Sequence, residues 1–484
     1  MKNFYLKKAQ DNFPEIIETE IVPDVRESVL KHGTSIVIDL KNHYVGYFSF
    51  RMKWVDIYID APVRLSVRFC ETKEELYDDF SAYKGSLCGS WLQEEIINID
   101  FPGEYKMPRR YAARYIKMSV IASPQKLVLT DFKYRAVTSA DVSRVKECQT
   151  ADGELQRIDK LSINTLKNCM QRVFEDGPKR DRRLWIGDLR LEALTNYETF
   201  HNLELVRRCL YLFAAAETNE LGFMASYIYE NPEFAAGEGS LIDYALLYVA
   251  CVCDYYKHSG DIEVLQDLYP LIKQQMDAAH RLLDQDGIIA VHETGGAFID
   301  WCEGLCKTTA LHGVYLYVLR LLIGILKETR HRDGEIYAKR LESAKEAASH
   351  ILVHPQKKIF VNEKDHFQYS VHSVVWMILG GVIEGEEAGK ALNDVLASEK
   401  SIKPFTPYMH HYVVEAMTEL QMFDEAAAYI KNYWGGMVKL GADTFYEVYV
   451  PGDPDFSPYG DRMINSMCHA WSCTPSYFIR KYHL

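Results

Sequence analysis

The densest group of reactive side chains lies between Asp176 and Asp188. These thirteen residues read Asp-Gly-Pro-Lys-Arg-Asp-Arg-Arg-Leu-Trp-Ile-Gly-Asp, with three carboxylates, four basic groups and one indole. The Gly-Pro pair near the start disfavours a regular helix, so this segment is predicted to be a loop. Beyond it, Leu189, Ala193 and Tyr197 recur with helical spacing, which predicts a helix that Asp188 can cap.

Carboxylates, guanidinium groups and an indole in one loop are the groups that a carbohydrate site needs. A glycosidase uses one carboxylic acid to protonate the departing oxygen and a second carboxylate to activate water or attack the anomeric carbon. Arg and further Asp residues bind ring hydroxyls, and Trp packs on the apolar face of a pyranose. The same composition is also typical of a helix cap with a solvated ion-pair cluster. This segment alone leaves both interpretations open.

The loop resembles the signature of the α-L-rhamnosidase family of six-hairpin glycosidases, Asp-Cys-Pro-Gln-Arg-Glu-Arg-Leu-Gly-Trp-Thr-Gly-Asp, without a gap. The same residue types stand at Asp176, Pro178, Arg180, Arg182, Trp185, Gly187 and Asp188. Asp181 stands where the family has its general-acid Glu and is one methylene shorter. The resemblance implies that Asp181 is the general acid. It also implies a set of sugar-binding residues in this loop, namely Asp176, Arg180, Trp185 and Asp188.

A second carboxylate follows near the end of the chain. Residues 441–449 read Gly-Ala-Asp-Thr-Phe-Tyr-Glu-Val-Tyr, and residues 465–472 follow after a Pro-rich loop. The first stretch resembles the family element in which the Glu of Thr-x-x-Glu is the general base, and the second resembles the Ser-x-x-His stretch that begins the final inner helix. The resemblance implies that Glu447 is the base and that His469 contacts the sugar or orients Glu447. A lone Glu near aromatic residues is otherwise typical of a surface group.

Two further loops carry candidate binding groups. Residues 236–240 present Glu238 between two glycines, just before a strongly apolar helix. Residues 298–303 repeat the pairing of carboxylate and indole at Asp300 and Trp301, and they resemble the Asp-Trp element that lines the family's sugar pocket. The alternative makes Asp300 a helix N-cap and Trp301 a core residue, and the two roles are compatible. Glu238, Asp300 and Trp301 are therefore candidate substrate-binding residues.

The first part of the chain, residues 1–145, shows the alternation of apolar residues that is typical of strands, for example at Ile36, Ile38 and Leu40. Short strands separated by Gly, Pro and Asp predict an antiparallel β-sandwich. Two stretches, residues 38–47 and 114–118, resemble the β-domain that precedes the rhamnosidase barrel. Aromatic-rich strands are equally compatible with a carbohydrate-binding module.

Residues 146–484 change to helical periodicity and are predicted to form an (α/α)6 toroid, the six-hairpin barrel. Residues 241–256 are apolar on nearly every face, as an enclosed helix must be, whereas residues 333–350 are charged on one side and belong outside. The predicted helices are 154–172, 188–217 with a break, 239–260, 262–284, 307–330, 333–353, 370–382, 386–398, 408–421, 423–434 and 463–480. Loops at one end of the toroid should carry the chemistry.

The composition is that of a globular protein. The 484 residues are 48% hydrophobic and 25% charged, and the net charge of −13 repels phosphate backbones and anionic membranes, so neither nucleic acid nor a membrane is an expected partner. We find no bilayer-spanning apolar run and no signal-peptide core. The 11 scattered cysteines predict a reducing, cytoplasmic location. They include no Cys-x-x-Cys pair, and we expect neither a metal nor another cofactor.

Sequence and resemblance together predict an inverting glycoside hydrolase that cleaves a terminal α-L-rhamnoside or a related deoxy-sugar glycoside. Because the chain stops shortly after its last predicted helix, we expect a small or oligomeric carbohydrate substrate; a homo-oligomer is compatible with the sequence. One alternative is a lyase on the same toroid, in which Arg180 or Arg182 neutralises a uronate. Another is a sugar-binding protein that has lost catalysis, which Asp181 in place of Glu permits. Replacing Glu447 by Gln separates binding from turnover.

Overall fold

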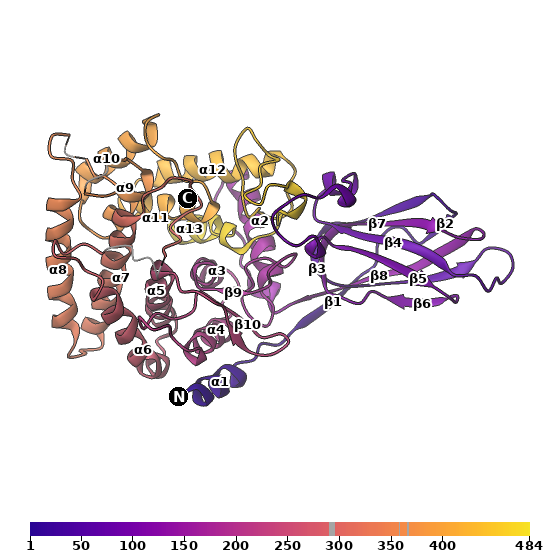
Figure 1. The fold of residues 1–484 in the computed structure, drawn as a ribbon, viewed down its shortest axis with the longest axis horizontal. Helices are drawn as coiled ribbons and strands as arrows, with labels where there is room; N and C mark the ends of the chain where they lie inside the picture. Colours follow the sequence, from indigo (N-terminus) through magenta and orange to yellow (C-terminus); the bar gives the residue numbers. More distant parts are fainter. Residues whose placement is uncertain (290–295, 358, 365–366) are drawn as a thin grey trace.

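The computed structural model describes residues 1–289, 296–357, 359–364 and 367–484 as a β-domain beside a ring of helices (Figure 1). Hydrogen bonds join the strands of the β-domain in the order β1-β8-β3-β7-β4-β5, with β2 paired to β8 and β6 paired to β3. All of these pairs are antiparallel. The strands are β1 (Ile17–Ile21), β2 (Glu27–Leu30), β3 (Ser35–Trp54), β4 (Val63–Cys70), β5 (Glu94–Ile99), β6 (Gly103–Lys106), β7 (Tyr111–Ala122) and β8 (Leu127–Thr138).

Strand β3 is long enough to pair with β7 along its first half and with β8 and β6 along its second half. A bulge between Asp39 and Tyr44 bends it, as extra residues in a ladder do. Gly46 lies where both neighbours approach; a Cβ there would be 2.1 Å from the carbonyl oxygen of Arg135. Alternate residues of the strands face a common apolar core, as the period-two pattern predicts. The predicted β-sandwich is confirmed.

The helical domain is a closed double ring. Six inner helices contact one another in sequence, and the last contacts the first: α3 (Ile186–Glu198), α5 (Ile242–Ser259), α7 (Thr308–Glu328), α9 (Val371–Leu379), α11 (Pro407–Glu419) and α13 (Pro475–Tyr482). Six outer helices alternate with them along the chain: α2 (Gly153–Cys169), α4 (Leu203–Ala215), α6 (Ile262–His280), α8 (Gly334–Ile351), α10 (Gly385–Ala397) and α12 (Phe423–Lys439). The predicted six-hairpin toroid is confirmed.

Burial follows the predicted division between inner and outer helices. In α5, every residue from Ile242 to Tyr255 is buried, whereas α8 buries only Tyr337, Ala344 and Ala348. An all-round apolar helix must be enclosed, because no face of it can meet water without cost. In the part of the chain that the structure describes, α7 alone is long and apolar enough to cross a bilayer, and it is a buried helix of the inner ring.

Two local predictions were wrong or incomplete. Residues 2–11 form a helix, α1 (Lys2–Asp11), rather than β-structure; its Tyr5 and Ala9 are buried against the toroid beside α4 (Figure 1). The predicted helix 463–480 is two 3-10 turns followed by α13, because Pro475 fits only the first turn of a helix. The predicted break in 188–217 is present, between α3 and α4.

The remaining elements are short. The 3-10 helices are η1 (Glu74–Leu76), η2 (Phe80–Ala82), η3 (Gly89–Trp91), η4 (Val142–Arg144), η5 (Arg462–Ile464) and η6 (Ala470–Ser472), and a small sheet comprises β9 (Leu184–Trp185), β10 (Tyr227–Tyr229) and β11 (Ala235–Ala236). The predicted domain boundary at residue 145 falls in the connection from β8 to α2, which contains η4.

All candidate residues lie on connections from an outer to an inner helix, or in the first turn of that inner helix. Asp181 is between α2 and α3, Glu238 between α4 and α5, Asp300 between α6 and α7, and Glu447 between α12 and α13. Connections of this kind share one end of a toroid, because the helices alternate in direction. The sequence-distant candidates are therefore brought to the same end.

Candidate active site

Asp176 organises the loop between α2 and α3. Its Oδ1 accepts hydrogen bonds from the backbone N–H groups of Gly177 (2.8 Å) and Arg183 (3.0 Å). Its carbonyl oxygen accepts one from the N–H of Ala470 (2.7 Å). Asp176 therefore joins the two ends of the loop to each other and to the connection between α12 and α13.

The tip of this loop has an unusual backbone. Asp181 and Arg182 have φ angles of 62° and 54°, in the left-handed region. Each such residue costs about 1 kcal/mol, and residues of this kind gather at functional sites. The Arg182 side chain supports the turn by donating to the carbonyl oxygens of Pro178 (2.9 Å) and Arg110 (2.8 Å). The side chain of Asp181 stays 21% exposed, whereas that of Arg180 is only 5% exposed.

The guanidinium group of Arg180 connects the two carboxylates that the sequence predicts to act together. Its Nη2 forms an ion pair with Oε2 of Glu447, and its Nη1 lies 3.6 Å from Oδ1 of Asp181. These two acids, 266 positions apart in the sequence, therefore lie on either side of one guanidinium group. Arg180 also donates to the carbonyl oxygen of Ile464 (3.3 Å) and packs 4.5 Å from the ring centre of Tyr459.

Glu447 is buried, with a side chain only 3% exposed, and several donors surround it. Oε1 accepts a hydrogen bond from the Tyr459 hydroxyl (2.7 Å), and Oε2 accepts one from the N–H of Ser466 (3.3 Å). Burial alone would raise the pKa of Glu447, but Arg180, His469 and Tyr459 outweigh it and hold that pKa below its usual value. Glu447 is thus a carboxylate at neutral pH, as a general base must be.

His469 lies between Glu447 and Asp188. Its Nε2 is 3.9 Å from Oε1 of Glu447, and its Nδ1 is 3.5 Å from Oδ1 of Asp188. Burial lowers the pKa of His469 to about 4, against the opposing pull of Glu447, so the imidazole is neutral at neutral pH. A neutral ring can both donate and accept a hydrogen bond.

Asp176 and Asp188 behave oppositely to Glu447. Burial, with the neighbouring charges of Asp181 and Asp188, raises the pKa of Asp176 well above its usual value. Burial, with Glu447 and Asp181 nearby, does the same for Asp188. Both carboxyl groups therefore hold a proton more readily than an ordinary aspartate, whereas Glu447 gives its proton up more readily. The site thus treats its acids unequally, which acid-base catalysis requires.

Asp188 does not cap α3, contrary to the sequence prediction. The helix begins at Ile186 with Trp185 in the N-cap position, and Asp188 lies in the first turn. Gly187 allows this arrangement, because a Cβ there would lie 2.5 Å from the ring of Tyr244.

Aromatic rings form a continuous lining beside these acids. Trp185 packs against Tyr227, with ring centres 4.3 Å apart, and meets Tyr244 edge-on at 6.3 Å. Further along, Trp301 lies 5.1 Å from Trp471 and 5.9 Å from Tyr459. Phe298 bridges the two groups, 5.7 Å from Tyr244 and 5.8 Å from Trp301. Trp185 and Trp301, the two predicted walls, are both partly exposed.

Two candidates lie apart from the acids. Glu238 is exposed, and its side chain makes no hydrogen bond or ion pair with the residues that the structure describes. Asp300 is fully buried and accepts hydrogen bonds from the Thr406 hydroxyl (2.7 Å), His372 Nε2 (2.7 Å) and backbone N–H groups including that of Trp301 (2.9 Å). Asp300 is thus an anchor for Trp301 and for the start of α11, and not the N-cap of its own helix. Sugar binding by either residue stays a prediction.

One group of side chains in the described ranges has metal-ligand spacing. Donor atoms of Asp300, Cys302 and His372 all lie within 4.8 Å of one another. However, the Asp300–His372 contact is an ordinary hydrogen bond of 2.7 Å, and burial together with Asp300 raises the pKa of the Cys302 thiol. Both carboxylate oxygens of Asp300 already accept hydrogen bonds from the protein, so this donor set does not fit a metal well.

Sequence reasoning missed Tyr459 and left Trp471 without a role. The Trp471 indole donates to the carbonyl oxygen of Glu447 (2.9 Å), and its position two residues after His469 is a signal that was available. Tyr459 lies in the Pro-rich loop before η5, where no periodicity marks it. Only the folded chain shows that its hydroxyl reaches Glu447.

Comparison with known proteins agrees with this geometry. Residues 10–137 match the N-terminal domain of glycosyl hydrolase family 78 α-rhamnosidases, and residues 143–482 match the bacterial α-L-rhamnosidase six-hairpin glycosidase domain. A solved rhamnosidase from Klebsiella oxytoca with rhamnose bound is 37% identical and superposes with a TM-score of 0.95, covering 100% of this chain and 99% of its own. None of the curated proteins compared matches.

Two more distant structures share the fold. A family 78 rhamnosidase of Bacillus sp. GL1 is 21% identical, with a TM-score of 0.79, and the match covers 95% of this chain and 48% of the Bacillus chain. An α-L-rhamnosidase of Streptomyces avermitilis complexed with L-rhamnose is 16% identical, with a TM-score of 0.71, and the match covers 96% of this chain and 44% of the Streptomyces chain.

A ring of six helical hairpins with unequal acids at one end defines a six-hairpin glycosidase. The family match spans residues 143–482, and the Klebsiella rhamnosidase matches over the whole chain. This chain therefore belongs to the bacterial α-L-rhamnosidases of glycoside hydrolase family 78, as the resemblance of the Asp176–Asp188 loop predicts.

Proposed function

We propose that this glycosidase hydrolyses terminal α-L-rhamnosides of small carbohydrates with inversion at the anomeric carbon. The observation that carries the proposal is Glu447, a buried carboxylate kept ionised by Arg180 and Tyr459 beside an aromatic lining. The family match and the rhamnose-bound Klebsiella relative support rhamnose as the sugar.

In the proposed reaction, Glu447 takes a proton from a water molecule while the oxygen of that water attacks the anomeric carbon. Asp181 gives its proton to the glycosidic oxygen as that bond breaks, and the alcohol leaves. An inverting enzyme needs about 6.5 to 9.5 Å between the two carboxyl groups to hold the water. Arg180 lies between these groups, which supports a separation of this kind. Proton exchange with solvent then restores both acids.

The remaining groups bind the sugar. Asp176 and Asp188 would form hydrogen bonds with ring hydroxyls, and the neutral His469 would contact the sugar or orient Glu447. Trp185 and Trp301 would pack against its apolar faces. The guanidinium group of Arg180 is bonded to Glu447, so we assign it chiefly to holding the base.

The anomer of the first product tests inversion. Proton NMR during hydrolysis of a nitrophenyl α-L-rhamnoside should show β-L-rhamnose first, followed by mutarotation. Initial release of the α-anomer would contradict the inverting assignment. An unsaturated product absorbing in the ultraviolet would instead indicate the lyase alternative.

We further propose a cytoplasmic location and short rhamnosides as substrates, without nucleic acid or membrane partners. All 11 cysteines are free, which supports a reducing compartment. Efficient hydrolysis of an intact polysaccharide, with none of short glycosides, would contradict the substrate size. Light scattering would decide whether the enzyme is a homo-oligomer.

A further inference from the structure

Lys179, next to Arg180 in the catalytic loop, is a buried lysine whose charged partners belong to the β-domain. Its side chain is only 3% exposed, forms an ion pair with Glu75, and lies 3.8 Å from Oε2 of Glu71. Burial would lower the pKa of Lys179, but the two glutamates outweigh it and keep the ammonium charged. Lysines are almost never buried unless they are paired, so this cluster fixes the loop against the β-domain.

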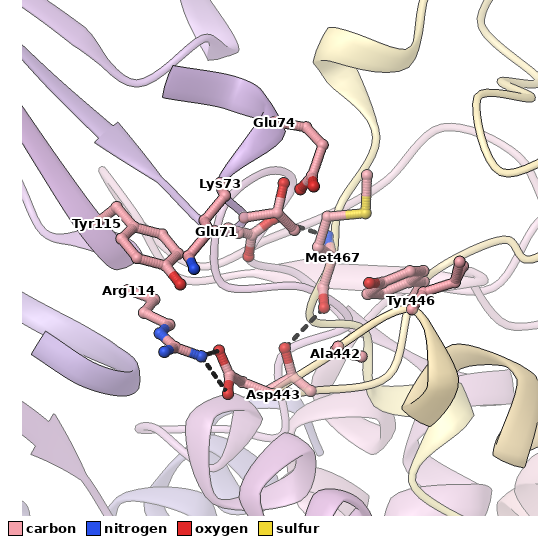
Figure 2. Close-up of a pocket in the computed structure, with 13 residues that line it drawn as sticks. Glu71, Lys73, Glu74, Arg114, Tyr115, Ala442, Asp443, Tyr446 and Met467 are labelled. Atoms are coloured by element: carbon pink, nitrogen blue, oxygen red, sulfur yellow. Dashed lines mark hydrogen bonds and ion pairs between the residues drawn. The ribbon is translucent and has the colours of Figure 1, made fainter. Parts of the chain in front are cut away.

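The same cluster holds the segment that follows the Pro-rich loop. Lys179 Nζ donates to the carbonyl oxygen of Asn465 (2.9 Å), and Glu71 Oε2 accepts from the N–H of Met467 (2.7 Å). Glu71 and Met467 both line a cavity of about 200 Å³ between the two domains, and Figure 2 shows the hydrogen bond that joins them. Ser466, which lies between Asn465 and Met467 in the chain, donates its N–H to Glu447. Glu71 is itself fixed by His43, 3.0 Å away.

A third contact from the β-domain supports Tyr459. The N–H of Ser86 donates to the carbonyl oxygen of Tyr459 (2.8 Å), and the N–H of Lys84 donates to Asp461 (3.1 Å). The segment 71–86 between β4 and β5 therefore restrains each of the three groups bonded to the carboxylate of Glu447: Arg180, Ser466 and Tyr459. In Figure 1 the small helices of this segment lie beside the yellow connection from α12 to α13.

We propose that Lys179, Glu75 and Glu71 are positioning residues for the general base, so that the β-domain is part of the catalytic apparatus. This inference rests on the proposed role of Glu447. Without the cluster, Arg180 and the 463–467 segment lose a fixed support, and their bonds to Glu447 lengthen. The carboxylate is then less well oriented toward the water and easier to protonate. The charged and titratable groups facing Glu447 are Arg180, His469, Tyr459 and Asp188.

The test compares Lys179→Met, Glu75→Gln and Lys179→Arg with wild type on a nitrophenyl α-L-rhamnoside. We expect Lys179→Met and Glu75→Gln to lower kcat at least tenfold with KM changed less than threefold. The acidic limb of the kcat/KM profile should move to higher pH, because Glu447 becomes easier to protonate. Lys179→Arg keeps the charge and should recover much of the loss. Glu75→Gln keeps shape and a hydrogen-bonding oxygen, which maintains the test if Lys179→Met does not fold.

The matched control is Arg480→Met, which removes another buried ion pair, with Asp159, between α13 and α2. It should lower Tm without moving the pH profile. Unchanged kcat and pH profile in both Lys179→Met and Glu75→Gln would overturn the inference, as would losses that merely follow Tm as in the control. Glu447→Gln, measured in parallel, separates the proposed base role of Glu447 from the positioning role of the cluster. If Glu447→Gln stays active, both the base role and this inference fail. If Glu447→Gln is inactive while Lys179→Met and Glu75→Gln are unaffected, only this inference fails.

Discussion

Among the residues that the structure describes, two arginine–glutamate pairs of the toroid are built alike, but only one of them belongs to the candidate active site. Arg180 pairs with Glu447 on loops, and Arg190 pairs with Glu415 inside the ring, at 3.2 Å. A tyrosine hydroxyl donates to the glutamate in each case, Tyr459 in the first and Tyr317 in the second. In both pairs, burial opposes ionisation and the arginine outweighs it, so the pKa of each glutamate is lowered.

The surroundings separate the two pairs. Arg190 also meets Asp254 at 3.3 Å, and its partners come from the well-packed helices α5, α7 and α11, so this pair joins four inner helices. Beside Arg180, Oδ1 of Asp188 and Nδ1 of His469 are buried without a hydrogen bond among the described residues. Atoms of this kind also lie beside the second pair, at His411 and Tyr412, so they do not distinguish the two regions. An arginine–glutamate pair therefore does not mark a catalytic site; the left-handed turn at Asp181 and Arg182 and the partly exposed Asp181 carboxylate beside Arg180 do.

The largest expected effect is the loss of catalysis when the Arg180–Glu447 pair is changed. Glu447→Gln removes the base, and we expect kcat to fall by about 10²- to 10⁴-fold, the usual contribution of a general base. Rhamnose binding should persist, because the sugar-binding groups remain. Kinetics with a nitrophenyl rhamnoside and calorimetric titration with L-rhamnose measure the two effects. A variant with wild-type kcat would remove Glu447 from the mechanism; inactivity of wild type and variant alike would favour the binding-protein alternative.

A change in the Arg190–Glu415 pair should lower the free energy of unfolding and leave catalysis nearly unchanged. Glu415→Gln leaves the charge of Arg190 buried with only Asp254 to balance it, and breaking a buried pair costs about 3 kcal/mol. We expect denaturant unfolding to show this loss, while kcat of the folded protein stays within about twofold, since no described contact joins Glu415 to the acids of the site. Strong loss of kcat without loss of stability would contradict the division between the two regions.

Asp181 is the next test, because it lies 3.6 Å from both Arg180 and Arg183, whereas Asp188 is buried and its pKa is raised. If Asp181 is the acid, Asp181→Asn should lower kcat about 100-fold for alkyl rhamnosides and much less for dinitrophenyl rhamnoside, whose leaving group needs no proton. Asp188→Asn, the matched control, should affect both substrates equally. The reverse pattern would transfer the acid role to Asp188.

Local patterns in the sequence predicted the elements well. All-round apolarity identified α5 as an inner helix, and period-two alternation located the strands, because burial imposes these patterns residue by residue. Helix α1 was missed, since it is short, rich in Lys and buries only Tyr5 and Ala9. The final helix was predicted too long, because the apolar residues of 463–474 pack in 3-10 turns.

The site was predictable only where local residue types carry it. Asp181 and Glu447 could be named as candidates because their flanking residues resemble a family signature. Tyr459, Glu71 and Glu75 were not, because long-range packing of the β-domain brings them to the site and nothing in their neighbours marks them. Asp300 is the opposite case, in which the sequence pattern suggests a role that the contacts do not show. Its pairing with Trp301 resembles a sugar site, yet its carboxylate oxygens accept hydrogen bonds from Trp301, Phe405 and Thr406.

The smallest expected effect is a difference in pH dependence between the two regions. The folded-state pKa of Asp188 lies above its unfolded value, so the folded state binds that proton more tightly. The contribution of Asp188 to the free energy of unfolding is complete below pH of about 4. It is lost as pH rises toward the folded-state pKa, by at most about 1.4 kcal/mol per pH unit. Glu415 has a lowered pKa, so its contribution is present above pH of about 4 and is lost as pH falls. We therefore expect Asp188→Asn to flatten the decline of unfolding free energy as pH rises above about 4, and Glu415→Gln to flatten the fall of unfolding free energy as pH drops below about 4. Equal slopes for wild type and Asp188→Asn above pH of about 4 would show that folding does not raise the pKa of Asp188, and would remove one of the features that distinguish the catalytic pair from the structural one.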